Sequence, residues 1–347
     1  MQRIRMLDIA NKAEVSLSCV ARYLNDTGYV SEAKREAIGK AVEELGYVPN
    51  RTAKILRGEN SHLIGHICTY ADENIMFSKM AMALEREAYA RGYQVITFFY
   101  EEGKSSLQEM FDTLISYHVD GVILNCAVAE EHAKELQRYV REVAVPVIMI
   151  ERCLDIYEID KVLFNYSEGS YVAARQLLLA GHECIGYIGR KRLRSVEIER
   201  FAGYQTALKE RNIEVPPEWI RDVEEYTIQN GYEAARDLLR SDIPFTAIFA
   251  SSDLLAAGVL RAAAELGISV PEKLSVVGYD DTIAEYMTPP LSTLRLPLSE
   301  VAKAVLEILI DKSKGTSQPS VGKTISLSPL YIERASVGKR KEMKSSC

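Results

Sequence analysis

Apolar residues at helical spacing predict two short helices near the start of the chain. Four of them lie at positions i, i+3, i+4 and i+7 of the first helix: Met6, Ile9, Ala10 and Ala13. A tight turn closed by Val15 follows, and Ser16 is the predicted N-cap of the second helix. Val20 and Leu24, four residues apart, form the predicted buried stripe of that helix.

A third helix is predicted after the polar loop at residues 25–29. Ser31 is its predicted N-cap, and Gly46 is its predicted C-cap because glycine readily adopts left-handed backbone. Its buried stripe consists of three apolar residues: Ile38, Val42 and Leu45. The first 46 residues therefore predict a small three-helix unit.

The second helix leaves Leu17, Ser18 and Arg22 on its outer face. A helix-turn-helix presents its second helix in this way to the major groove of DNA. An ordinary helix pair in a small bundle would show the same spacing, so the spacing alone leaves both interpretations open.

From His62 onward, short runs rich in apolar and β-branched residues alternate with amphipathic helical segments. The predicted strands are 63–69, 94–99, 121–124, 147–150, 161–164, 185–188, 247–250 and 275–279. The predicted helices are 78–91, 107–118, 168–180, 197–211, 232–240, 254–266 and 298–311. This alternation predicts parallel sheets with helices on both faces, and the length favours two such halves.

Charge is distributed unevenly along the 347 residues, whose net charge is −7. Residues 1–60 carry ten Lys/Arg and eight Asp/Glu, a net charge of +2. The rest of the chain carries the other 32 Lys/Arg and 41 Asp/Glu, a net charge of −9. A mildly basic head on an acidic body is compatible with DNA binding through the head alone.

The six cysteines are scattered and form no C-x-x-C pair, which is typical of reduced thiols in a cytoplasm. No run approaches the ~20 apolar residues of a membrane helix, and the N-terminus lacks an apolar signal core. We therefore expect a cytoplasmic protein with no membrane association.

Sequence motifs for catalysis and metal binding are missing. The sequence contains no G-x-x-x-x-G-K-[ST], G-x-G-x-x-G, G-x-S-x-G or H-E-x-x-H. His182 and Cys184 have no neighbours at metal-ligand spacing, and His182 is expected to cap or pack the turn at Gly181. Asp280 and Asp281 are adjacent in a tight loop, where side chains usually point apart. We therefore expect no enzyme activity, no metal and no cofactor.

The run at residues 30–50, VSEAKREAIGKAVEELGYVPN, resembles the third helix and exit loop of the lactose/galactose repressor (LacI/GalR) family. The start is similar too, with these residues in the family's places: Val15, Ser16, Val20, Arg22, Leu24 and Asn25. The resemblance covers nearly the whole chain, and VPEKLSVVGYDD at residues 270–281 is its most recognisable motif in the body.

The resemblance implies an N-terminal all-α helix-turn-helix head and an α/β body like periplasmic binding proteins, made of two doubly wound parallel-sheet subdomains. The expected parts are the DNA-binding head 1–49, the hinge helix and linker 50–60, the effector-binding and dimerisation body 61–338, and the tail 339–347. Within the body, the expected halves are 61–160 with 292–322, and 161–291 with 323–338.

The resemblance also implies a homodimer that binds a palindromic operator. The implied DNA contacts are Leu17, Ser18, Arg22, Asn25, Ser31, Asn50, Arg51, Ala53 and Leu56. Residues 50–58 match the family's hinge helix, which is too short to be stable alone and is expected to order on DNA. Leu56 matches the leucine that wedges into the minor groove. A plain exposed tether is the alternative.

A small-molecule effector is implied in the cleft between the halves. The implied effector contacts are Phe77, Arg200, Tyr226 and Asp253. Arg200 offers a planar donor fork to hydroxyls, carboxylate or phosphate; its alternative is a surface ion pair with Glu197 or Glu199. Asp253 can accept from hydroxyls or amines, or can cap the following helix. The two aromatic residues offer a flat face to a sugar or base, or belong to the core.

Several positions depart from the family pattern. Glu14 stands where glycine or asparagine is usual, and left-handed backbone there would cost about 1 kcal/mol. Ala21 replaces a usual serine, and Phe164 replaces a usual aspartate beside Asn165. The first cleft loop, residues 70–77, is atypical. We therefore expect the effector to differ from the family's common sugars.

Taken together, these patterns predict a DNA-binding transcriptional regulator, expected to be a repressor, that responds to a small metabolite. A solute-binding protein is a second possibility, opposed by the missing signal peptide and by the first 58 residues. A sugar-modifying enzyme is a third, opposed by the absent catalytic set. The tail shows no heptad leucines, so a coiled-coil tetramer is not expected.

Overall fold

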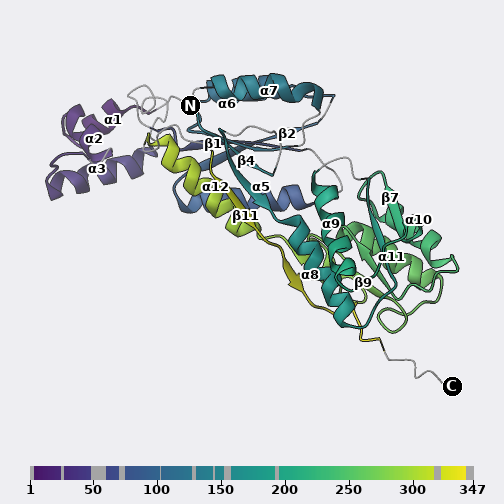
Figure 1. Ribbon diagram of the computed structural model, residues 1–347. Helices are drawn as coiled ribbons and strands as arrows, with labels where there is room; N and C mark the ends of the chain where they lie inside the picture. Colours follow the sequence, from purple (N-terminus) through teal and green to yellow (C-terminus); the bar gives the residue numbers. More distant parts are fainter. Residues whose placement is uncertain are drawn as a thin grey trace, which may run out of the picture. The chain divides into compact units, whose positions relative to one another are not determined.

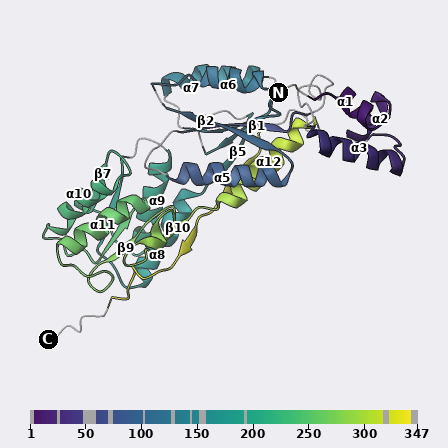
Figure 2. The ribbon, with the colours of Figure 1, turned by 180° about the vertical axis from the view of Figure 1, so that it is seen from behind.

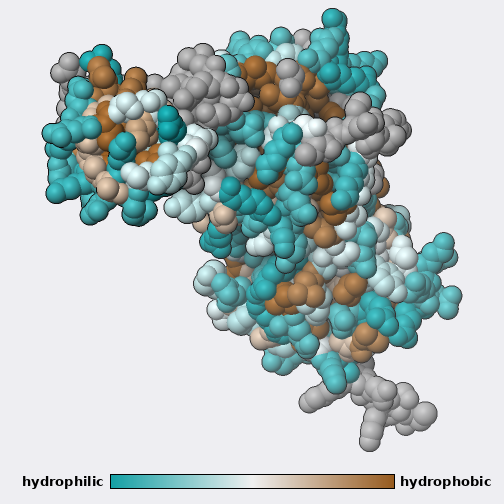
Figure 3. All heavy atoms as spheres, turned by 90° about the vertical axis from the view of Figure 1, so that its left-hand side faces the viewer, coloured by the Kyte–Doolittle hydropathy of each residue, from teal (hydrophilic) through white to brown (hydrophobic). Residues whose placement is uncertain are grey.

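The computed structural model describes residues 4–24, 27–47, 60–69, 75–101, 103–126, 130–143, 145–151, 158–191, 195–315 and 322–340. The chain divides into two compact units, a head at Met1–Ser61 and a body at His62–Cys347, and each is described by itself. Polar residues separate the apolar ones into several patches on the face of the body seen in Figure 3.

The head consists of three helices, as predicted. They are α1 (Met6–Lys12), α2 (Leu17–Leu24) and α3 (Glu32–Leu45). Their buried core contains Ile9, Ala10, Cys19, Val20, Val30, Ile38, Ala41 and Tyr47. Because the apolar residues recur at helical spacing, each helix turns one stripe into this shared core.

The ends of these helices agree with the predicted caps in most respects. The Ser16 hydroxyl accepts the Cys19 backbone N–H at 3.3 Å, which confirms it as a cap of α2. Gly46 ends α3 with a left-handed φ of 60°, and Glu14 is left-handed at 51°. Ser31 stands at the N-cap of α3, but its side chain makes no capping bond, so that part of the prediction is wrong.

The first half of the body is built on a six-stranded parallel sheet with the order β11-β5-β4-β3-β1-β2. Its strands are β1 (Leu63–Thr69), β2 (Gln94–Tyr100), β3 (Val122–Asn125), β4 (Val147–Ile150), β5 (Asp160–Phe164) and β11 (Thr324–Leu327). Its helices are α5 (Ile75–Ala90), α6 (Leu107–Ser116), α7 (Glu130–Glu142) and α12 (Leu298–Ser313).

These helices cover both faces of the sheet. Helices α5 and α12 lie side by side on one face, and α6 and α7 cover the other (Figures 1 and 2). Along β1, Ile64 packs into the cluster with α5 and α12, whereas Ile67 packs into the cluster with α6. Because successive strand residues point to opposite faces, both must be apolar when both faces are covered.

The second half is built on a four-stranded parallel sheet with the order β7-β6-β8-β9. Its strands are β6 (Ile185–Arg190), β7 (Ile220–Val223), β8 (Ala247–Ala250) and β9 (Ser275–Val277). Its helices are α8 (Tyr166–Leu179), α9 (Ser195–Lys209), α10 (Ile228–Leu239), α11 (Asp253–Glu265) and the 3-10 helices Pro217–Trp219 and Ala284–Tyr286. Buried residues form one cluster with α8 and α9 and another with α10 and α11.

Three connections join the halves. The first runs from β5 into α8. The second leads from β9 to β10 (Thr293–Arg295), and the third leads from β11 to β12 (Leu330–Ile332). Strands β10 and β12 pair antiparallel, so two of the crossing segments are hydrogen-bonded to each other. This agrees with the predicted multiple crossings.

The predicted boundaries inside the body are misplaced by one strand. The predicted division puts β5 in the second half from residue 161, but β5 pairs with β4 in the first sheet. It likewise puts β11, beyond residue 322, in the second half, but β11 pairs with β5. The halves therefore change after Phe164 and after Leu327. Sequence alternation reveals a strand but does not say which sheet it joins.

All eight predicted strands are present, with ends shifted by up to two residues. Helix α7 and the strands β7, β10, β11 and β12 were not predicted as such. Helix α7 has few apolar residues, and the missed strands are short and partly exposed, so no continuous apolar run marks them.

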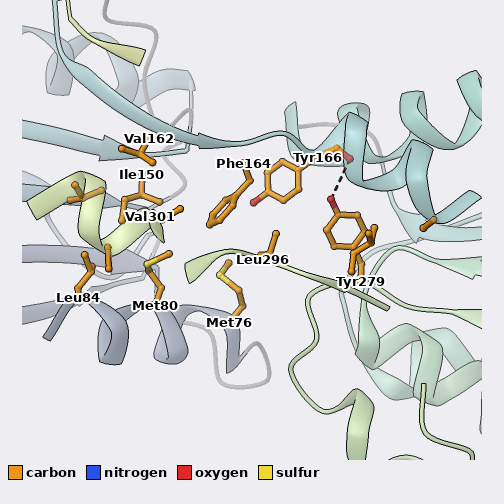
Figure 4. Packing of buried hydrophobic residues seen from close by; sticks show 14 of the residues in the cluster. Met76, Met80, Leu84, Ile150, Val162, Phe164, Tyr166, Tyr279, Leu296 and Val301 are labelled. Atoms are coloured by element: carbon orange, nitrogen blue, oxygen red, sulfur yellow. Dashed lines mark hydrogen bonds between the residues drawn. The ribbon is translucent and has the colours of Figure 1, made fainter. Parts of the chain in front are cut away.

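Figure 4 shows where the buried cluster of the first half meets the second. Phe164 and Tyr166 stand at the first connection, and the Tyr279 hydroxyl donates to the Tyr166 carbonyl oxygen at 3.2 Å. Within the described ranges, no helix has the length and apolar character needed to cross a bilayer. Those same ranges contain no group of three or more His, Cys, Asp or Glu that could hold a metal ion.

Candidate functional site

Arg200 is the centre of a buried polar cluster in the body. Its side chain on α9 is 4% exposed and donates to the Ser251 carbonyl oxygen and, at 2.7 Å, to Asp280 Oδ1. The guanidinium carbon lies 3.9 Å from the ring centre of Tyr279 and 4.8 Å from that of Tyr166. The alternative of a surface ion pair with Glu197 or Glu199 is therefore wrong, since Arg200 pairs with a residue 80 positions away.

Strand order explains this convergence. Strands β6, β8 and β9 are neighbours in the second sheet and run parallel. Arg190 ends β6, Ser251 follows β8, and Asp280 lies shortly after β9. Because the carboxyl ends of parallel strands share one edge, these residues meet where α/β sheets usually bind ligands.

Asp280 and Asp281 point apart, as predicted for a structural turn. Asp280 pairs with Arg200, whereas Asp281 pairs with Arg295 at 2.6 Å and with Arg334 at 2.8 Å. Both aspartates have left-handed backbone, with φ of 97° and 51°. Burial raises the pKa of Asp280, and the Arg200 guanidinium opposes that rise.

Asp253 is the first residue of α11 and is 1% exposed. Its Oδ2 accepts the Thr282 backbone N–H at 2.6 Å and the Thr282 hydroxyl at 3.3 Å, and its Oδ1 accepts the Thr293 hydroxyl at 2.6 Å. The helix cap is Ser252, not Asp253. The observed role of the carboxylate is thus to hold two segments that lead toward the first half, and its effector contact stays a prediction.

The two predicted aromatic contacts lie in different places. Tyr226 stands 5.9 Å from the Arg200 guanidinium, and its buried hydroxyl has no hydrogen-bond partner among the described atoms. Phe77 on α5 is half-buried and packs against the cluster of the first half. The structure brings Tyr226 to Arg200, and for Phe77 the effector role remains a prediction.

Glu151 is a site residue that the sequence analysis did not select. It follows β4 directly, has a left-handed φ of 65°, and accepts a hydrogen bond from the Tyr166 hydroxyl. Burial is the main effect that raises its pKa. Strained non-glycine backbone concentrates at functional sites. A polar residue directly after a buried strand was the available signal.

Glu197 is the second such residue. It is 6% exposed and precedes Arg200 by one turn of α9. Its Oε1 lies 4.0 Å from the Arg190 guanidinium, and its Oε2 has no hydrogen-bond partner among the described residues. A buried carboxylate oxygen without a partner is energetically costly, so this atom needs an explanation.

A cavity of about 250 Å³ opens beside this cluster, between the two halves of the body. It is lined by Glu151, Leu163, Phe164, Asn165, Tyr166, Ser167, Val196, Glu199 and Ser326. Glu151, which follows β4, and residues of β5 and β11 in the first half thus face residues from α8 and α9 of the second. Its size suits a small molecule.

The head presents the predicted outer face of α2 to solvent. Leu17 is 49% exposed, and Ser18 and Arg22 are exposed beside it. Ser31 is half-buried at the start of α3. The other predicted DNA contacts lie outside the described residues: Asn25, Asn50, Arg51, Ala53 and Leu56.

Known proteins share both units. Residues 5–50 match the family model of bacterial regulatory proteins, lacI family, and residues 174–337 match the periplasmic binding protein-like domain. The chain is 32% identical to the ribose operon repressor of Haemophilus influenzae over 334 residues, which cover 96% of this chain and 98% of that protein. It is 30% identical to the HTH-type transcriptional repressor PurR of Actinobacillus pleuropneumoniae over 331 residues, covering 95% and 97%.

Solved structures agree with these relatives. The chain is similar to a lac repressor dimer bound to operator and the anti-inducer ONPF, with a TM-score of 0.82, 25% identity, and coverage of 97% of this chain and 100% of that one. It is also similar to a transcriptional regulator CelR–cellobiose complex, with a TM-score of 0.69, 26% identity, and coverage of 96% and 100%. The predicted fold class is confirmed.

The curated relatives are transcriptional repressors rather than enzymes, so the chain is a DNA-binding transcriptional regulator. With 32% identity to one repressor over 96% of its length, and with a head that matches the family model, the chain belongs to the lacI family of bacterial regulatory proteins.

Proposed function

We propose that this chain is a homodimeric repressor that binds a palindromic operator and is controlled by a small, hydroxyl-rich metabolite bound at the Arg200 cluster. One head has too few base contacts for a specific site, and two-fold symmetry doubles them. The observation that carries the effector site is the convergence of Arg200, Tyr226 and Asp280 at the strand ends beside a cavity.

Control would pass from the body to the head without contact between effector and DNA. The cavity is lined by both halves, so a ligand there changes the equilibrium between their arrangements only by binding one arrangement better than the other. In a dimer, such a change alters the spacing of the two linkers and hence operator affinity. The sense of the response, release or promotion of DNA binding, follows from which arrangement the ligand prefers.

Fluorescence anisotropy with DNA from upstream of the chain's own gene tests operator binding. Arg22→Ala should relax preference at one base pair per half-site by ~1–3 kcal/mol, because arginine can bond guanine bidentately. Lys40→Ala is the matched control, since Lys40 is an exposed cation of the head on α3 rather than on α2. An unchanged site-selection profile for Arg22→Ala would refute the assignment of α2 as the recognition helix.

Homodimerisation is tested by sedimentation velocity. We expect a dimer at micromolar concentration, with operator affinity lost on dilution to monomer. A monomer that retains specific operator binding would contradict the dimer proposal.

A further inference from the structure

Gly39 is a glycine inside a helix of the head, at a position where the backbone does not require one. It lies in helical backbone within α3, where glycine is markedly less favourable than alanine. Gly28 and Gly46, in contrast, have left-handed backbone, with φ of 69° and 60°, which accounts for both of them. The presence of glycine at residue 39 therefore needs a different explanation, and the packing around it supplies one.

The space above Gly39 is occupied by Tyr23 of α2. A Cβ atom at Gly39 would lie 2.9 Å from the Tyr23 hydroxyl oxygen and 3.8 Å from Cζ of the same ring. A separation below 3.0 Å is essentially never seen for a real Cβ atom. Tyrosine has a rigid ring and only two side-chain torsions, so the hydroxyl can move away only if the ring itself turns. A side chain at residue 39 and the Tyr23 hydroxyl thus compete for the same space.

The Tyr23 ring takes part in the packing of α2 on α3. It is half-buried and packs against the buried core of the head. Tyr23 follows the buried residues Cys19 and Val20 by four and three positions, so it extends their stripe into the last turn of α2. Because the distance between packed helices depends on the side chains at their contact, this ring determines how the last turn of α2 lies on α3.

Arg22 is carried by the same turn and is exposed on the outer face of α2. Its backbone carbonyl oxygen accepts the Thr27 N–H at 3.0 Å. Its Cδ lies 3.4 Å from the position that a Cβ atom of Gly28 would take. The following loop thus contacts this turn at Arg22, and α3 contacts it at Tyr23. A shift of the Tyr23 ring would therefore move the backbone from which Arg22 projects.

We propose that Gly39 and Tyr23 are positioning residues of the recognition helix: the glycine receives the hydroxyl end of the tyrosine and so fixes the orientation in which Arg22 meets the base edges. Neither residue needs to touch DNA. Binding groups must be held within about 0.5 Å of their productive geometry, so a small displacement of α2 is enough to weaken base contacts. The inference rests on the proposed function, because it takes α2 as the recognition helix.

The test uses duplexes that the full wild-type chain selects from a random DNA library, with a scrambled duplex of the same composition as the non-specific reference. In fluorescence anisotropy, Gly39→Ala should weaken binding to the selected duplex by about tenfold or more, because a displaced arginine loses its bidentate contact to a base. Binding to the scrambled duplex should stay unchanged, because non-specific affinity comes from phosphate contacts.

Tyr23→Phe supplies the matched rescue. It removes the oxygen atom 2.9 Å from the added Cβ and leaves Cζ at 3.8 Å, an ordinary van der Waals contact. Tyr23→Phe alone should bind both duplexes like the wild type. Gly39→Ala in the Tyr23→Phe background should bind the selected duplex within about twofold of Tyr23→Phe alone. Three results would each overturn the proposal: no loss in Gly39→Ala, a loss that persists in the double variant, or a loss in Tyr23→Phe by itself.

Amide hydrogen exchange of α3 in the full chain separates positioning from simple stability. Gly39→Ala should keep or increase the protection of α3, because alanine favours a helix more than glycine does. Loss of this protection would show that the glycine only stabilises the head, and the positioning role would be wrong.

The selection step separates this inference from the proposed function. If the wild-type chain selects no sequence from the library, the proposed operator binding fails and the inference fails with it. If the wild-type chain selects a sequence that Gly39→Ala binds equally well, the proposed function stands and the inference alone fails.

Discussion

Replacement of Asp253 by asparagine should remove a pH dependence from the stability of the body. Burial, together with repulsion from Asp280, raises the pKa of Asp253 from 3.8 to about 7. The folded protein therefore keeps this proton at pH values where the unfolded chain has released it. The contribution of Asp253 to the free energy of unfolding is therefore largest at low pH. It falls as pH rises from about 4 to about 7 and stays constant at higher pH.

The size of the effect follows from the shift. One pKa unit corresponds to about 1.4 kcal/mol. Between about pH 5.5 and 8, this group should lower the free energy of unfolding by about 2 kcal/mol, because the folded protein holds the proton over roughly 1.5 pH units of that range. Asparagine keeps the shape and one acceptor oxygen but does not titrate, so it should abolish this slope.

Urea unfolding at a series of pH values, followed by Trp219 fluorescence, measures the difference. Trp219 is the single tryptophan of the chain and packs against both large clusters around the second sheet, so it reports on the body. The same experiment on Asp242→Asn, an exposed aspartate, controls for a general charge effect. Wild-type and Asp253→Asn curves of unfolding free energy that run parallel between about pH 5.5 and about pH 8 would refute the reasoning.

Three further predictions follow from contacts in the structure. Ser16→Ala should destabilise the head by about 1 kcal/mol and Ser31→Ala should have little effect, because of these two hydroxyls only that of Ser16 caps its helix; thermal unfolding of the two variants compares them. Arg200→Met should destabilise the body by ~3–5 kcal/mol by leaving Asp280 buried and unpaired, and the added change Asp280→Asn should recover much of that loss in urea unfolding. Gly203→Ala should cost about 3 kcal/mol or more, because its Cβ would lie 2.0 Å from a backbone carbonyl oxygen of α8; equal stability would show that α8 and α9 can separate freely.

The three helices of the head could be predicted from the sequence because their stability signals are local. Ile9 and Val20 recur at helical spacing, and Gly46 ends the third helix where its backbone is left-handed. Each of these signals lies within a few residues of the element it describes. Strands β4 and β8 of the body were found for the same reason, since each is buried along its whole length and is continuously apolar.

The Arg200 site shows what local pattern cannot supply. Resemblance identified Arg200, Tyr226 and Asp253, and the structure places Tyr226 beside Arg200. It also shows that the carboxylate of Asp253 is already engaged by two threonines. A residue type at one position does not reveal which donors reach it from elsewhere in the chain.

What the sequence by itself determined was therefore the order and kind of the elements, the exposed face of α2, and the family of the chain. Only the tertiary structure decided that β5 and β11 belong to the first sheet, that Arg200 pairs with Asp280, and that Glu151 and Glu197 join the same cluster. The physical reason is that periodicity records whether a residue is buried, whereas sheet order determines which distant residues are buried together.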